Sequence, residues 1–183
     1  PLQPTSAEFA ARAALGQRIP AARLLWCTQT KIFHSSLGAW NPHQVTGTAA
    51  EGRPRWSLDG RTILFERVNG ASYDVYLMND DFLNVRKIIS GAHTADWAEN
   101  GAWVTAIQHA DDHTVAEGYR VIKYILSTGK SSVLHDATAA GFNGWPMSQA
   151  AELHPAGRYL ATFTSNGDGN HHTYLVDLIG KKY

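Results

Sequence analysis

One stretch of the sequence decides the fold: PRWSLDGRTILF, residues 54–65. It has the pattern of a strand end, a tight Asp59-Gly60 turn and a new strand that begins near Thr62. Asp-Gly is a strong hairpin signal, because a two-residue turn of this kind needs a positive φ at both central positions. The stretch therefore predicts an antiparallel hairpin with a two-residue turn.

The same pattern returns twice, as ADWAENGAWVTA at 95–106 and AELHPAGRYLAT at 151–162. In each copy an apolar residue lies four positions before a glycine. The glycines are separated by 101 − 60 = 41 residues and then by 157 − 101 = 56 residues. A period of about 40–45 residues is typical of a propeller blade, including WD40-like repeats, and the longer gap indicates an insertion.

Each turn is followed by further short, alternating strand patterns, so each repeat predicts four antiparallel strands. The fold class is therefore all-β, a β-propeller with three clear blades and a degenerate one that lacks the Asp-Gly turn. Residues 1–22 form an extension in which 6–15 favour a short helix capped by Ser6. The expected blades span residues 23–50, 51–91, 92–138 and 147–183.

Two copies of the repeat carry a family resemblance. Trp56-Ser57-Leu58-Asp59-Gly60-Arg61 is followed by Asp74–Asn79, and Leu153–Arg158 is followed by Thr173–Asp177. This pattern, across 23–183, resembles the TolB-type β-propeller repeat. Similar repeats build the Tol periplasmic translocation protein, the propellers of prolyl-oligopeptidase-like peptidases and oligogalacturonate-lyase-like enzymes. The resemblance implies an extracytoplasmic (periplasmic or secreted) location, but a fold so widely shared does not specify a reaction.

Propellers of this type generally have six to eight blades, whereas 183 residues supply about four. We favour part of a larger ring, which another chain completes or which is truncated. The alternative is a four-bladed ring with an unusual closure. The count of blades thus raises the question of how the sheet edges are covered.

Composition excludes several classes of partner. Sixteen basic residues balance 16 acidic ones, so no nucleic-acid partner is expected. No apolar run reaches the roughly 18 residues of a spanning helix. Cys27 is the only cysteine, so no internal disulfide is expected, and no Gly-x-Ser-x-Gly nucleophile motif is present.

Three polar residues fall at or near equivalent points before the first strand of a blade: Arg53, His93 and Gln149. Loops at such points line one mouth of a propeller channel, where ligands commonly bind. His93 is the candidate acid/base group and Arg53 the candidate partner of a carboxylate. The alternative for His93 is a hydrogen-bonded turn residue.

The nine histidines suggest a divalent metal as a candidate cofactor. His109 and His113 flank two aspartates, and His171 precedes His172, although adjacent strand residues face opposite ways. Solvated loops or polar hairpins are the alternatives. In lyase-like relatives, histidines and a glutamine before the turn hold the metal, but alanines follow Gln149 here. His34 and His43 could supply ligands, yet nothing in the sequence connects them.

Aromatic residues in or near loops could stack on sugar rings: Trp40, Trp145 and Tyr119. Packing between blades is the alternative for each. The sequence thus favours a recognition scaffold for a ligand or protein partner. A metal-assisted, polysaccharide-lyase-like enzyme acting on acidic sugars is the second hypothesis, so enzymatic activity stays open. A structural fragment that works only within an assembly is the third.

Overall fold

The computed structural model describes the chain in these ranges: 23–28, 30–36, 41–46, 49–70, 72–98, 101–109, 119–136, 147–153, 158–165 and 171–178. All regular elements in these ranges are β-strands, which confirms the all-β class. The helix predicted over 6–15 lies outside the described residues, as do Trp40, His113 and Trp145. In the described ranges, no helix has the length and apolar character needed to cross a membrane.

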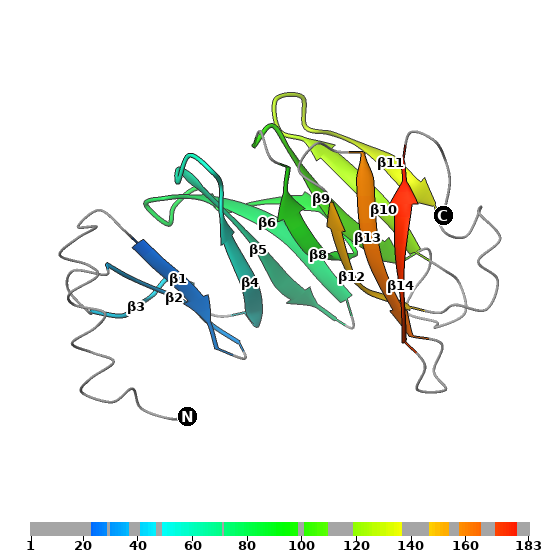
Figure 1. The fold of residues 1–183 in the computed structure, drawn as a ribbon. Helices are drawn as coiled ribbons and strands as arrows, with labels where there is room; N and C mark the ends of the chain where they lie inside the picture. Colours follow the sequence, from blue (N-terminus) through cyan, green and yellow to red (C-terminus); the bar gives the residue numbers. More distant parts are fainter. Residues whose placement is uncertain are drawn as a thin grey trace. The chain divides into compact units, whose positions relative to one another are not determined.

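The strands form antiparallel sheets in chain order, as expected for propeller blades (Figure 1). The first sheet contains β1 (Arg23–Cys27), β2 (Ile32–Ser36) and β3 (His43–Gln44). The second contains β4 (Glu51–Trp56), β5 (Thr62–Asn69), β6 (Ser72–Asn79) and β7 (Arg86–Ile89). The third contains β8 (Ala92–Trp97), β9 (Trp103–His109), β10 (Tyr119–Ile125) and β11 (Lys130–Asp136). The fourth contains β12 (Met147–Leu153), β13 (Tyr159–Ser165) and β14 (His171–Asp177).

The chain forms two compact units, Pro1–Pro54 and Arg55–Tyr183, and their boundary falls within β4. The first unit holds the sheet β1–β2–β3. The second unit holds β5 to β14, and we call its sheets the second, third and fourth blades in chain order.

The turn at Asp59-Gly60 differs from the two-residue turn that the sequence predicts. Gly60 has φ of 66°, but Asp59 is not among the residues with positive φ. Ser57 closes the loop by donating its N–H to Thr62 O at 2.8 Å, which leaves four residues between them. Four-residue hairpin loops are most often built around a type I turn, so only the glycine needs the left-handed conformation.

The repeat unit is reproduced in hydrogen bonds. Ala98 donates to Trp103 O and Gly101 to Ala98 O, as Ser57 and Gly60 do in the second blade. The residue after each turn glycine then accepts a bond from just beyond the third strand of its blade. These bonds join Asp80 N to Arg61 O, Leu126 N to Ala102 O and Leu178 N to Arg158 O. The sequence repeat is therefore a repeat of backbone geometry.

Apolar residues of neighbouring blades form the core of the second unit. Leu64, Val75 and Leu77 of the second blade pack with Val104 and Ala106 of the third in one buried cluster. A second cluster joins the third and fourth blades through Ile107, Val121, Leu160 and Val176. Blades pack face to face because alternate residues of each strand form an apolar face, and this face is buried against the next sheet.

Candidate functional site

An irregularity interrupts the inner strand of the third blade near its start. The β8–β9 register shifts by one residue between His93 and Asp96, and Thr94 there has φ of 51°. Left-handed backbone is strained for a β-branched residue, so the surrounding structure must hold it. Such bulges re-aim side chains and are frequent beside functional sites.

The bulge recurs in the repeat. Arg53 has φ of 49° and lies 60 − 53 = 7 residues before its turn glycine, as Thr94 does at 101 − 94 = 7. The β12–β13 register also shifts, between Ser148 and Ala150. Arg53 therefore corresponds to Thr94, and His93 lies one position earlier.

A buried carboxylate of the second blade holds the third-blade bulge in place. Glu66 on β5 is 3% exposed, and its Oε1 accepts a hydrogen bond of 3.0 Å from Ala95 N. Without such a partner, a buried backbone N–H costs about 1–3 kcal/mol. Glu66 thus fixes the backbone just after Thr94.

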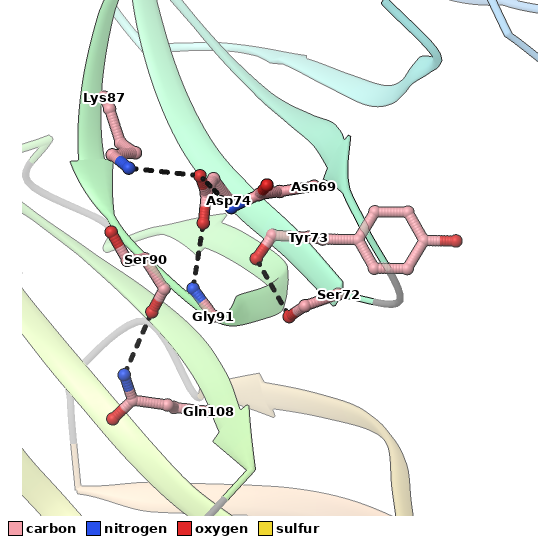
Figure 2. A network of polar contacts seen from close by, with 8 residues as sticks. All are labelled: Asn69, Ser72, Tyr73, Asp74, Lys87, Ser90, Gly91 and Gln108. Carbon is pink, nitrogen blue, oxygen red and sulfur yellow. Dashed lines mark hydrogen bonds and ion pairs between the residues drawn. The ribbon is translucent and has the colours of Figure 1, made fainter. Parts of the chain in front are cut away.

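A second buried carboxylate fixes the connection between the two blades (Figure 2). Asp74 at the start of β6 is 3% exposed and accepts bonds from Asn69 Nδ2 at 3.1 Å, Lys87 Nζ at 3.2 Å and Gly91 N at 3.0 Å. Gly91 has φ of 63°, in the region that favours glycine. The segment that leads into β8 is therefore held at the residue before Ala92.

His93 and Tyr73 lie beside these anchors. Their ring centroids are 6.4 Å apart with the planes at 64°, an edge-to-face contact. His93 Nδ1 lies 2.8 Å from Thr94 Oγ1 in a hydrogen bond whose direction depends on the tautomer. Tyr73 is 43% exposed, and its ring points away from the Asp74 network in Figure 2.

We call Tyr73, Asp74, Gly91, His93 and Thr94 the β6–β8 rim. It offers an imidazole, a hydroxyl and an exposed aromatic ring on backbone that two buried carboxylates hold still. Preorganised groups of this kind lose little entropy when a ligand binds. The arrangement is suited to recognition by hydrogen bonding and stacking, and an imidazole can also transfer protons.

The predicted site residues are only partly brought together. His93 lies in the second unit and Arg53 in the first. Only backbone is described for four other candidates: His109 and Tyr119 are directly paired across β9 and β10, while Gln149 lies on β12 and His171 begins β14. The described residues contain no group of three or more His, Cys, Asp or Glu side chains able to hold a metal ion.

Sequence reasoning missed Glu66, Tyr73 and Asp74. A signal was available, since Glu66 directly follows the apolar run Ile63–Phe65 and Asp74 precedes Val75 within a strand pattern. Carboxylates in buried strand positions require hydrogen-bond partners.

A small pocket lies at the far end of β8 from the β6–β8 rim, beside the first turns of the second and third blades. It has a volume of about 220 Å³, and Ser57, Asp59, Trp97 and Leu126 contribute to its lining. The hydrogen bond of 2.6 Å from Ser57 Oγ to Asp59 Oδ1 is the largest cause that lowers the pKa of Asp59. Trp97 ends β8, whereas His93 lies near its start, so this pocket is distinct from the β6–β8 rim.

Comparison with known proteins shows the fold. No family model and no curated protein matches the sequence. Among solved structures, a putative TolB from Agrobacterium tumefaciens is similar at a TM-score of 0.66 and 18% identity, over 89% of this chain and 57% of that one. An oligogalacturonate lyase in complex with manganese is similar at 0.65 and 13%, over 83% of this chain and 40% of that one. The oligogalacturonate lyase from Vibrio parahaemolyticus matches at 0.61 and 15%, over 99% and 46%.

These similarities confirm the TolB-type propeller resemblance at the level of fold. The chain spans roughly half the length of the structures it matches, between 40% and 57% of the three just described. It therefore has the structure of part of a propeller. At identities this low the likeness carries no reaction.

Proposed function

We propose that this propeller portion is an extracytoplasmic recognition scaffold that binds an acidic carbohydrate or a protein partner at the β6–β8 rim. The observation that carries the proposal is the pairing of an accessible His93–Tyr73 edge with backbone held by Glu66 and Asp74. The location rests on the resemblance to the Tol periplasmic protein.

The proposal is supported by the free-energy cost of forming the β6–β8 rim. Two carboxylates are buried to about 3% exposure, and a non-glycine residue adopts a positive φ. Strained backbone of this kind costs about 1–3 kcal/mol and is concentrated at binding and catalytic sites.

Two measurements test the proposal. Titration of the isotope-labelled protein with trigalacturonate, followed by amide NMR, is expected to shift Tyr73 and His93 and to leave Leu58 unmoved. In cells of the source organism, a photo-crosslinking residue at Tyr73 is expected to give a discrete adduct that the same residue at Leu58 does not give. Leu58 is a matched control because it is 74% exposed and lies at the other end of the strands. If both measurements give no response specific to position 73, the proposal is wrong.

A metal-assisted lyase acting on acidic sugars is the second candidate, supported by the likeness to the manganese-bound oligogalacturonate lyase. In this hypothesis His93 serves as acid or base, and Arg53 pairs the uronate carboxylate. The divalent metal would be bound by His109, His113 or His171. The ligand-binding groups would be Trp40, Trp145, Tyr119 and Gln149. A separate chain completing the ring would be a further partner.

The lyase hypothesis has its own test. Polygalacturonate incubated with the protein and Mn²⁺ should give the absorbance of an unsaturated product, and His93→Gln should abolish it. Trigalacturonate binding without product supports the scaffold and counts against the lyase.

A further inference from the structure

Two histidines that the sequence leaves unconnected lie directly opposite each other in the first sheet. His34 on β2 pairs with His43 on β3, next to the pair Phe33 and Gln44. Directly opposite residues of an antiparallel pair share one face of the sheet, with Cβ atoms about 4.5–5.5 Å apart. The register therefore places both imidazoles on one face.

The position is accessible to an ion from solvent. His34 is half-buried and His43 is exposed. Each side chain carries ring nitrogens that can act as ligands when the imidazole is neutral.

We infer that His34 and His43 form a two-imidazole site for a borderline divalent transition-metal ion of the Zn²⁺, Ni²⁺ and Cu²⁺ class. Imidazole nitrogens bind such ions at about 2.0–2.1 Å, a reach that two rings on opposed strands can share. Oxygen-seeking ions such as Mg²⁺ and Ca²⁺ are a poor match for two nitrogens. Water would occupy the remaining coordination positions.

A metal ion bound to both histidines would join β2 to β3. The strand β3 is two residues long, so little backbone pairing holds it to β2. A bound ion that joins the two strands would add its binding free energy to the folded sheet, because the unfolded chain lacks the paired geometry. The site lies in the Pro1–Pro54 unit and does not depend on the β6–β8 rim.

The test uses the full chain and Zn²⁺ alone. We expect one titration step in which the imidazole ¹⁵N resonances of His34 and His43 move together. The matched control is the double variant His43→Gln/Gln44→His, which keeps nine histidines but puts the ring opposite Phe33, on the other face. Removal of even an outer-shell partner costs about 10–100-fold in affinity, so the control should bind at least about tenfold more weakly. Equal affinity, or movement of only one ring, overturns the site.

Two further variants keep the test independent of folding defects. His34→Asn should lose the step while circular dichroism shows the sheet intact. Arg23→Gln should bind Zn²⁺ more tightly than the wild type, because a cation that repels the ion is removed from beside His34. A merely structural role for the two histidines would not increase metal affinity. Unchanged or weaker binding in a folded Arg23→Gln protein contradicts the inference.

Discussion

The second and third blades have the same backbone but different polar chemistry. Both close their first turn with the same two hydrogen bonds around Gly60 and Gly101. At the start of the third strand, however, Asp74 of the second blade pairs with Lys87, whereas Arg120 of the third pairs with Asp136. Asp74 and Arg120 thus lie at the same position of the repeat with opposite charge, whereas their partners lie at different positions, since Lys87 aligns with Val133 and Asp136 with Ser90.

Burial separates the two pairs. The Asp74 side chain is 4% exposed, while that of Asp136 is 28% exposed. Asp74 also accepts a hydrogen bond from Gly91 N, so it fixes the entry into the next blade. The repeat thus places a charged residue at the start of the third strand, and the burial of that residue's ion pair decides whether the pair organises a site.

The largest expected effect is the loss of Asp74. Asp74→Ala removes the acceptor of three donors, two of them neutral, and hydrogen bonds to charged groups contribute about 1.5–3 kcal/mol each. We expect the free energy of unfolding to fall by about 3 kcal/mol in urea titrations. The matched variant Asp136→Ala should cost less than about 1 kcal/mol, as exposed pairs do. Equal costs would erase the distinction between the blades.

The next effect concerns Glu66. Glu66→Ala leaves the buried Ala95 N–H without this acceptor, at a cost of about 1–3 kcal/mol. Hydrogen exchange at Ala95 should accelerate. Glu66→Gln keeps an acceptor oxygen and should retain most of the protection, so equally fast exchange in both variants would show that Glu66 does not hold the bulge.

A smaller effect is expected at the first turn. Ser57 Oγ accepts a bond from Thr62 N at 3.0 Å, and the third blade has Ala98 at this position. Ser57→Ala should lower the unfolding free energy by about 1 kcal/mol and raise the pKa of Asp59. Ala98→Ser should act in the opposite direction by about 0.5 kcal/mol, if the turns are interchangeable. Destabilisation by both substitutions would show that they are not.

The smallest effect is a response to pH in the third blade. Burial is the main cause that lowers the pKa of His135, while Asp136 acts in the opposite sense. The unfolded chain therefore binds more protons than the folded one between the lowered pKa and the ordinary value near 6.5. Stability should decrease as pH falls through this window and should be unaffected above it. The difference in unfolding free energy between wild type and His135→Gln, measured by urea unfolding at several pH values, should change with pH in this window and become constant above pH of about 7.5.

Much of the fold could be predicted from local patterns. The predicted turns at Gly60 and Gly101 lie between the first two strands of their sheets, because a glycine before a β-rich run is typical of a hairpin. The third predicted turn, at 154–157, lies outside the described residues. The turn type was wrong, since Asp59 does not take the positive φ that a two-residue turn demands. Of the predicted site residues, only His93 lies in the β6–β8 rim. Tyr73 and Asp74 were not predicted, because no sequence motif links them to His93.

The sequence by itself determined the repeat, its all-β class and the turn glycines, because each depends on residues a few positions apart. Only the tertiary structure decided which carboxylates support the rim. Glu66 reaches Ala95 across 29 residues and Asp74 reaches Gly91 across 17, contacts that exist only once two blades pack. The same holds for His34 and His43, since strand register, not spacing, places them opposite each other.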